Sequence, residues 1–215
     1  MLIEEIMIKD VTTLSPSNTV KDALQTMHHN KIRHIPIVSA EGEVVGIITD
    51  RDLKEIVPSS ISEITDYSIY TIKLAEVMIT NLITGHPMDF VEEAAVTFYD
   101  NKIGALPIIS NNKLVGIITE TDLLYKYIEL TGAHQPGSQI EVRVPNVPGI
   151  LFEVSKVFHE QKTNVLSVLV YPDKENDATK ILVIRINSMN PLAIIQGLKD
   201  SGFEVLWPNV PGIVI

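Results

Sequence analysis

Two short segments combine residue types that can bind a sugar phosphate. Residues 46–52 read Gly-Ile-Ile-Thr-Asp-Arg-Asp and residues 116–122 read Gly-Ile-Ile-Thr-Glu-Thr-Asp. Each places a threonine and an aspartate three residues apart, between an apolar run typical of a strand and the start of a helix. A helix N-terminus favours an anion, the threonine adds a donor, and the aspartate accepts hydrogen bonds from both hydroxyls of a ribose. The segments therefore indicate two sites for an anionic ligand that carries a ribose.

The same residue types also have a purely structural use. A Ser or Thr followed three residues later by an acid forms a capping box, which stabilises a helix start and binds nothing. Glu or Gln is the usual acid in that motif, whereas both copies here use Asp, at positions 52 and 122. The retention of the pair in both segments favours a ligand, but the sequence leaves both interpretations open.

Catalytic and metal chemistry lack the residues they need. The chain contains no cysteine, which excludes thiol nucleophiles, disulfides and cysteine metal clusters. His28 and His29 are adjacent on an expected helix and point in different directions, and no carboxylate stands at the spacing of a known zinc motif. Since no nucleophile with a positioned base is found, the sequence predicts a protein that is not an enzyme and has neither a metal site nor a catalytic cofactor.

The composition restricts the expected partners. The 215 residues are 45% hydrophobic and carry 17 basic against 27 acidic side chains, which gives a net charge of −10. Nucleic acids and anionic membrane surfaces need basic faces, so neither is an expected partner. No apolar run approaches the roughly 18 residues of a membrane span. Glu4 and Glu5 stand where a signal peptide would be positive, so the sequence predicts a cytoplasmic protein.

The first 130 residues contain an internal duplication. At an offset of 71, identities run from Met7 with Met78 to Pro36 with Pro107, and after a one-residue deletion they continue at an offset of 70. Each copy predicts the order β-α-β-β-α. The first copy is expected to contain an extended piece at 11–14, a helix at 20–30, strands at 35–38 and 44–48, and a second helix from Thr49 that stops before Pro58. Two such units bury their apolar faces against each other, which predicts an intramolecular pair with pseudo-twofold symmetry.

The pattern changes after a segment rich in turn-forming residues, 131–138. The remaining elements are expected to be strands at 140–144, 165–171, 180–186 and 203–206, with helices at 150–158 and 192–198. The order β-α-β-β-α-β is that of a ferredoxin-like sandwich with both helices on one face. The fold class is thus α/β (α+β). The expected divisions are a first repeat at 1–60, a linker and start of the second repeat at 61–77, the second repeat at 78–130, a linker at 131–138 and a third domain at 139–215.

These motifs resemble two known domain families. The order Thr13 to Pro16, Arg33-His34-Ile35-Pro36 and residues 46–52, repeated at Thr84 to Pro87, Leu106-Pro107 and residues 116–122, resembles a cystathionine-β-synthase-type (CBS) domain pair. Residues 139–207, with Asn-Val-Pro-Gly-Ile-Leu at 146–151, look like an ACT amino-acid-sensing domain. The combination resembles the acetoin-utilisation regulatory proteins of Gram-positive bacteria.

The resemblance implies a regulatory protein whose ligand is an adenosine nucleotide of the AMP, ADP or ATP type, bound in the cleft of the CBS pair. Asp52 and Asp122 would hold the ribose, and backbone near Ile35 and Leu106 would meet the adenine. The residues expected to line the two sites are Thr13, Pro16, Arg33, His34, Ile35, Pro36, Thr49, Asp52, Thr84, Leu106, Pro107, Thr119 and Asp122.

The two sites are expected to be unequal. Arg33 and His34 stand where members of the family often carry phosphate-binding basic residues, whereas the aligned positions of the second copy are Gly104 and Ala105. Only one site is therefore expected to bind phosphate strongly. The sequence leaves open whether Arg33 serves the site of its own repeat or, across the interface, that of the other.

The third domain offers a weaker candidate site. Pro148 and Gly149 leave backbone amides free at a helix start, a place suited to an amino acid or another small metabolite, and the residues expected there are Asn146, Gly149, Ile150 and Leu151. ACT domains often have an acid where this chain has Asn146, so the ammonium group of an amino acid loses a charged partner. Residues 145–150, Pro-Asn-Val-Pro-Gly-Ile, recur at 208–213, and the sequence does not explain the recurrence.

The remaining expectations concern assembly. A ferredoxin-like sheet has an exposed edge, so a homodimer is expected, formed either through that edge or through stacked CBS pairs. The linker, with Gly132, Pro136 and Gly137, is expected to act as a hinge. The output would pass to a target enzyme that the sequence does not name. The alternative function is a structural or protein-interaction adaptor with degenerate, ligand-free sites.

Overall fold

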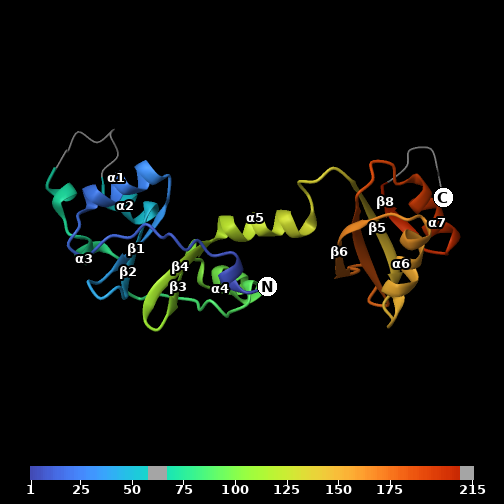
Figure 1. The fold of residues 1–215 in the computed structure, drawn as a ribbon, viewed down its shortest axis with the longest axis horizontal. Helices are drawn as coiled ribbons and strands as arrows, with labels where there is room; N and C mark the ends of the chain where they lie inside the picture. Colours follow the sequence, from blue (N-terminus) through green and yellow to red (C-terminus); the bar gives the residue numbers. More distant parts are fainter. Residues whose placement is uncertain (58–66, 209–215) are drawn as a thin grey trace. The chain divides into compact units, whose positions relative to one another are not determined.

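The computed structural model describes residues 1–57 and 67–208. The chain forms two compact units, Met1–Leu124 and Tyr125–Ile215, and helix α5 (Glu120–Thr131) begins in the first and ends in the second (Figure 1). Pro58, expected to stop the second helix, and residues 209–213 of the recurring segment lie outside the described residues. No helix in the described ranges is long and apolar enough to cross a membrane.

The first unit contains the two repeats, each an antiparallel hairpin flanked by two helices. In the first repeat these are α1 (Val20–Asn30), β1 (His34–Val38), β2 (Val44–Thr49) and α2 (Asp50–Ile56). In the second they are α4 (Val91–Asn101), β3 (Ala105–Ser110), β4 (Lys113–Thr119) and α5. These helices and hairpins confirm the predicted fold class.

The extended piece expected at 11–14 is reduced to a single bridge. Leu14 pairs with Ile37 in parallel. Within the described residues its ladder bonds are from its N–H to the Pro36 carbonyl at 3.2 Å and from the Val38 N–H to its carbonyl at 2.9 Å. Pro36 has no N–H to donate, which limits the ladder at this point. The second repeat has the same bridge between Gly85 and Ile108, beside Pro107.

The core of each repeat contains a residue from the segment that precedes the other repeat in the sequence. Ile3 is fully buried in the core of the second repeat, and Leu74 is fully buried in the core of the first. The two residues are 71 positions apart, which is the offset of the duplication. The repeats therefore exchange equivalent segments, the ones around Ile3 and Leu74. The short elements that carry or flank these residues, which sequence patterning did not predict, are the 3-10 helices η1 (Ile3–Glu5) and η2 (Tyr67–Thr71) and the helix α3 (Leu74–Val77).

The same exchange joins the repeats through backbone hydrogen bonds. The Ile8 N–H donates to the Ile117 carbonyl at 2.9 Å and the Ile117 N–H donates back at 3.0 Å. Ile47 and Ile79 form the equivalent pair at 3.0 and 2.9 Å. The two pairs are related by the offsets of the duplication, as the predicted pseudo-twofold symmetry requires.

Two glycines leave room for methionine side chains where these segments cross. A side chain at Gly46 would begin 2.4 Å from the sulfur of Met78, and one at Gly116 would begin 2.6 Å from the sulfur of Met7. Real Cβ atoms do not approach other atoms so closely. The glycine that opens each motif is thus explained by packing against the exchanged segment.

The second unit contains a four-stranded antiparallel sheet in the order β6-β7-β5-β8, with α6 and α7 on one face (Figure 1). Its elements are β5 (Ser138–Pro145), α6 (Ile150–Glu160), β6 (Val165–Pro172), β7 (Thr179–Ile186), α7 (Leu192–Asp200) and β8 (Glu204–Trp207). Alternate residues of β5 and β7, such as Val142 and Ile184, form the core with both helices. The ferredoxin-like prediction is therefore confirmed.

The linker expected at 131–138 is shorter at both ends and is bound to the second unit. Thr131 ends α5, and its carbonyl accepts a hydrogen bond from Ser167 Oγ at 2.8 Å. Arg185 Nη2 donates to the Gln135 carbonyl at 2.6 Å. Because these contacts hold residues 131–135 to β6 and β7, they give no support to a free hinge there.

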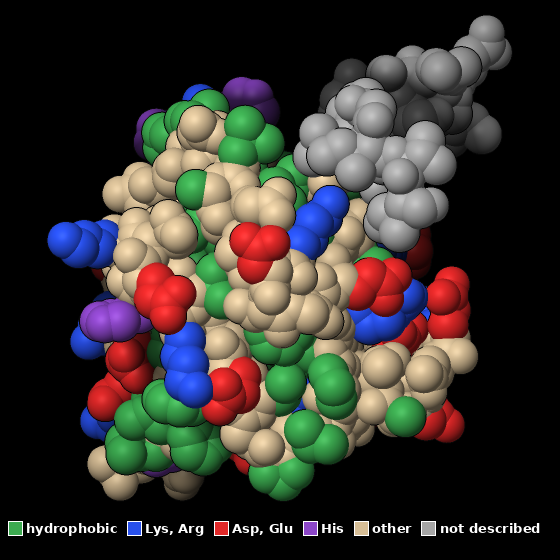
Figure 2. Space-filling model, turned by 90° about the vertical axis from the view of Figure 1, so that its right-hand side faces the viewer, with side chains coloured by type: hydrophobic (Ala, Val, Ile, Leu, Met, Phe, Trp, Pro, Cys, Tyr) green, Lys and Arg blue, Asp and Glu red, His purple; other side chains and the backbone are tan. Residues whose placement is uncertain are grey.

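A charged cluster connects β5 and β8 to the loop after β6. Arg143 Nε donates to Asp173 Oδ2 at 2.6 Å, and its Nη atoms contact Glu204 at 2.9 and 3.0 Å and Glu175 at 3.1 Å. Asp173 is buried and also accepts from the Glu175 N–H and from Thr179 Oγ1. Hydrogen bonds from the Glu175 backbone and Thr179, together with Arg143, hold the pKa of Asp173 below its usual value. Figure 2 shows acidic and basic side chains interspersed on the face that it presents.

Acid is expected to weaken this cluster. The Asp173 carboxylate contributes stability above its unfolded pKa of about 3.9, and this contribution is lost as the pH falls through the lowered pKa of the folded state. Asp173→Asn should therefore lower the melting temperature more at pH 7 than at pH 3, as measured by calorimetry. An equal loss at both pH values would contradict an ionised Asp173 in the folded protein.

Candidate ligand-binding site

The two Thr-Asp pairs have the same geometry, and it is that of a capping box. Asp52 Oδ2 accepts from the Thr49 N–H at 2.8 Å and from Thr49 Oγ1 at 2.7 Å, while the Asp52 N–H donates to Thr49 Oγ1 at 3.3 Å. Thr119 and Asp122 repeat these three distances. In both pairs the other carboxylate oxygen, Oδ1, takes no hydrogen bond from the described residues, which leaves one acceptor for a ligand hydroxyl.

A third pair shows that Asp can serve this structural purpose alone. Thr19 and Asp22 form a capping box at the start of α1, with Asp22 Oδ2 accepting from the Thr19 N–H at 2.8 Å and from Thr19 Oγ1 at 3.0 Å. Hydrogen bonds from the Thr19 backbone, the Thr19 hydroxyl and Asn18 lower the pKa of Asp22. The use of Asp instead of Glu is therefore no evidence for a ligand, contrary to the argument from sequence.

Strand register brings the other predicted residues of the first site to the same end of the hairpin. His34 lies opposite Thr49 in the β1–β2 ladder, and the Asp50 N–H donates to the Arg33 carbonyl at 2.9 Å. Thr13 precedes Leu14, whose bridge places that segment beside β1. The second hairpin repeats the arrangement, with Ala105 opposite Thr119.

The predicted prolines and apolar residues contribute differently. The carbonyl of Pro16 accepts from the Ala75 N–H at 3.1 Å. Pro87, the aligned residue that was not predicted to line the site, accepts from the Glu4 N–H at 3.0 Å, so both prolines hold the exchanged segments. Thr84 is half-buried beside Gly85, the bridge residue of the second repeat. Four further residues are buried in the two cores and can present only backbone to a ligand: Ile35, Pro36, Leu106 and Pro107.

His34 extends from the first repeat to the second. A Cβ at Gly104 would lie 2.8 Å from His34 Nε2 and 3.8 Å from a carboxylate oxygen of Glu120. Burial lowers the pKa of His34, and Arg33 lowers it further, while the carboxylates of Glu120, Asp52 and Asp50 act in the opposite direction. His34 therefore lies between the motifs of both repeats, and its ring would have to shift to make room for a side chain at position 104.

Sequence reasoning did not select Gly104 or Glu120 as site residues. Glu120 occupies the motif position of Asp50 in the other repeat, and this alignment was the available signal. The Arg33 side chain is exposed and forms no ion pair within the described part of the chain. No group of three or more metal-binding side chains lies close together among the described residues.

In the second unit the candidate residues separate into exposed and buried ones. Gly149 is at the N-cap of α6 with φ of +83°, a conformation that favours glycine, and α6 has no side-chain cap there. Asn146 is exposed, and its N–H donates to the Ala178 carbonyl at 2.8 Å. Ile150 is buried in the core, whereas Leu151 is about half exposed. A ligand at this helix start would meet backbone amides and Leu151 but not Ile150.

Comparison with known proteins adds independent information. The CBS domain model matches residues 3–59 and 74–129, and the ACT domain model matches residues 138–199. An inosine-5'-monophosphate dehydrogenase from Methanocaldococcus jannaschii is 37% identical over 122 residues, which are 56% of this chain and 22% of that protein. Because the chain spans so little of that enzyme, the match concerns the CBS region and not the catalytic part.

Two solved structures are similar over most of their own length. A candidate acetoin utilization protein (AcuB) from Vibrio cholerae is 32% identical with a TM-score of 0.55, and the match covers 63% of this chain and 96% of that one. The CBS domain pair of protein MJ0100, solved with 5'-methylthioadenosine and S-adenosyl-L-methionine, is 25% identical with a TM-score of 0.51 and covers 59% and 99%.

Proposed function

Because the chain belongs to the CBS domain family and carries an ACT domain after its CBS pair, we propose that it is a regulatory protein that senses an adenosine nucleotide. The observation that carries the proposal is the repeated Thr-Asp pair, each with one aspartate oxygen free among the described residues. A free carboxylate oxygen beside a threonine at a helix start suits the hydroxyls of a ribose. The adenosine ligands of the MJ0100 pair support this choice of ligand.

The proposed binding roles follow the positions of the residues. Asp52 and Asp122 accept from ribose hydroxyls, with Thr49 and Thr119 fixing their carboxylates. The adenine meets backbone near the buried strand residues of β1 and β3. Arg33 supplies a phosphate partner that its counterpart, Gly104, cannot supply.

We propose further features for the ACT domain and for the protein as a whole. The ACT domain binds an amino acid or another small metabolite at the start of α6, where backbone amides lack a side-chain cap. The protein acts in the cytoplasm as a homodimer, passes its signal to a target enzyme and catalyses no reaction itself. The likeness to AcuB from Vibrio cholerae supports a role in acetoin catabolism.

A structural adaptor is the second candidate function, and one observation favours it. The Thr19–Asp22 pair has the same capping geometry as the two motif pairs. If the motifs are caps only, titration calorimetry with AMP, ADP, ATP and S-adenosylmethionine will show no binding. Saturable binding of any of these ligands would exclude the adaptor with ligand-free sites.

The two sites are expected to differ in their need for phosphate. Titration should show one tight site that prefers AMP to adenosine and one weaker or empty site. Arg33→Ala should remove the preference for AMP, because it removes a charged partner of the phosphate. Lys31→Ala, an exposed cation two residues away, is the matched control and should leave the preference unchanged. Two equal sites that do not respond to Arg33→Ala would refute the proposed asymmetry.

A further inference from the structure

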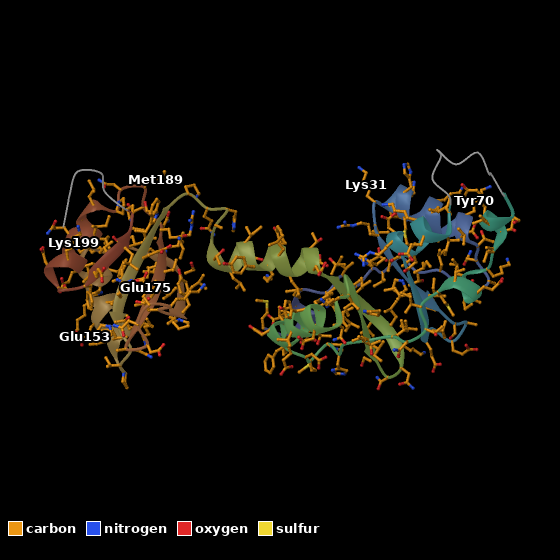
Figure 3. All side chains as sticks on the ribbon, turned by 180° about the vertical axis from the view of Figure 1, so that it is seen from behind. Lys31, Tyr70, Glu153, Glu175, Met189 and Lys199 are labelled. Atoms are coloured by element: carbon orange, nitrogen blue, oxygen red, sulfur yellow. The ribbon has the colours of Figure 1, made fainter. Side chains whose placement is uncertain are left out.

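The imidazole of His34 stands where the second repeat lacks a side chain. Gly104 is the counterpart of Arg33 at the duplication offset, and a Cβ built on it would lie 2.8 Å from His34 Nε2 and 3.2 Å from Cε1. The ring therefore occupies the place where a side chain of residue 104 would begin. Lys31, at the C-cap of α1 and labelled in Figure 3, shows where the chain enters the segment that carries His34.

The face of the β1–β2 hairpin that carries His34 is turned toward the second repeat. His34 and Thr49 are directly opposite in the antiparallel ladder, so their side chains lie on the same face. Ile47 shares that face, two residues before Thr49, and packs with Ala105 and Ile117 of the second repeat. Ala105, the counterpart of His34, ends at its Cβ and cannot return the contact. The contact of the imidazole with the second repeat is therefore one-sided.

Four charged groups act on the His34 ring. They are Arg33 next to it in the chain, the Asp50 and Asp52 carboxylates of α2, and the Glu120 carboxylate of α5. Glu120 acts most strongly of the three carboxylates, and its oxygen lies 3.8 Å from the same Cβ position that His34 Nε2 borders. Burial lowers the pKa of His34 from its usual 6.5, and Arg33 lowers it further. The ring is therefore neutral in most molecules at pH 7.

This charge state decides what the second motif offers a phosphate. Asp122 and the nearby Glu120 bring two carboxylates to the start of α5, and Gly104 brings no cation. With His34 neutral, a phosphate at this motif meets like charges, which repel it. A protonated His34 neutralises Glu120 and adds a charged N–H donor, which forms a stronger hydrogen bond to phosphate than a neutral donor does.

We propose that the second motif binds the phosphate of an adenosine nucleotide only when His34 is protonated, so that a side chain of the first repeat makes this site dependent on pH. The first motif differs, because Arg33 keeps its charge throughout the physiological range. A fall in pH therefore adds a second bound nucleotide to the CBS pair. The inference rests on the nucleotide-binding function proposed above and specifies when its weaker site is filled.

Proton linkage fixes the direction of the effect. Bound phosphate stabilises the protonated ring, so binding at the second motif takes up a proton and strengthens as the pH falls, by at most about tenfold per pH unit. The ligand itself acts in the opposite direction, because a phosphate monoester such as AMP loses negative charge below its second pKa of about 6. A gain of affinity in acid must therefore come from the protein.

Titration calorimetry of the full chain with AMP tests the proposal. We expect one site at pH 8 and two at pH 6. His34→Gln keeps a polar side chain that does not titrate, so it should show one site at both pH values. His28→Gln, at an exposed histidine of α1 in the same repeat, is the matched control and should behave as the wild type. Asp122→Asn should remove the site that appears in acid and leave the other.

The outcomes separate this inference from the function on which it rests. An equal number of sites at both pH values would overturn the pH-dependent site and leave nucleotide binding intact. A second site that still appears in acid in His34→Gln would do the same. No binding of AMP at either pH would refute both the inference and the proposed function.

A proton NMR titration of the ligand-free protein tests the geometry without nucleotide. The His34 signal, identified by its absence from His34→Gln, should titrate below pH 6.5. Its pKa should fall further in Glu120→Gln, because that change removes the carboxylate that most favours the protonated ring. Glu129→Gln, at an exposed position further along α5, is the control and should leave the His34 pKa unchanged. A His34 pKa that does not respond to Glu120→Gln would overturn the proposal.

Discussion

Asp52→Asn and Asp122→Asn are each expected to weaken adenosine-nucleotide binding at their own site by on the order of 10- to 100-fold. That range corresponds to the roughly 1.5 to 3 kcal/mol contributed by a hydrogen bond to a charged group. The substitution keeps the shape of the side chain and one oxygen. It removes the second oxygen and the negative charge that the ribose hydroxyls would use.

The effect on stability should be much smaller. Asp52 Oδ2 is occupied by Thr49, and the single oxygen of asparagine can take over that capping role. What is lost is a negative charge in the first turn of a helix, which contributes about 0.3 to 1 kcal/mol. Titration calorimetry and thermal unfolding of the same variants therefore separate ligand binding from capping.

Asp22→Asn is the matched control for this experiment. Asp22 forms the same capping box with Thr19, but it lies outside the two motifs. We expect it to lower stability by a similar small amount and to leave nucleotide affinity unchanged. If the Asp52 and Asp122 variants bind every adenosine nucleotide as the wild type does, all three pairs are caps and the site assignment is wrong.

Ile3→Ala is expected to destabilise the first unit by about 2 to 5 kcal/mol, although Ile3 is the third residue of the sequence. Removing a fully buried isoleucine side chain costs both its transfer free energy and the cavity left behind. That cavity would form in the core of the second repeat, beside Phe98 and Leu106. Leu74→Ala should produce a loss of similar size in the first repeat, because Leu74 is the equivalent residue.

The chain offers a control and two independent probes for this prediction. Ile8 lies in the same segment but is 47% exposed, so Ile8→Ala should cost about 1 kcal/mol or less. Trp207 is the only tryptophan, and it lies in the second unit. Urea unfolding followed by circular dichroism should shift for Ile3→Ala, while the tryptophan fluorescence transition should not. An unchanged circular dichroism midpoint would show that Ile3 does not complete that core.

Local patterning predicted the elements that depend on nearby residues. The spacing of Val20 and Met27 predicted α1, and the threonine before Asp50 predicted the start of α2, because periodicity and capping act within a few residues. The ferredoxin-like order of the second unit was predicted for the same reason. The predicted bounds of β8, 203–206, differ by one residue from the observed Glu204–Trp207. Such errors arise because the ends of a strand are set by its register with the neighbouring strand.

The exchange of Ile3 and Leu74 could not be predicted in this way. The duplication aligned Met7 with Met78, but a repeat does not reveal which core receives a segment when both cores have the same pattern. The position of His34 against Gly104 has the same origin, since it depends on the packing of one repeat against the other. The capping and ligand interpretations of Asp52 remained open because both use the same residue types at the same spacing.

The exchanged segments also impose an order on synthesis by the ribosome. The buried core of the first repeat uses residues from Val20 to Leu74, so it can close while most of the second repeat is still unmade. Ile3 must wait for Ala94, which follows it by 91 residues. At about 5 to 20 residues per second, that wait lasts about 5 to 18 s, during which Ile3 has no core to enter. The core of the second repeat can therefore form only by packing around Ile3, in a segment synthesised before any part of the β3–β4 hairpin.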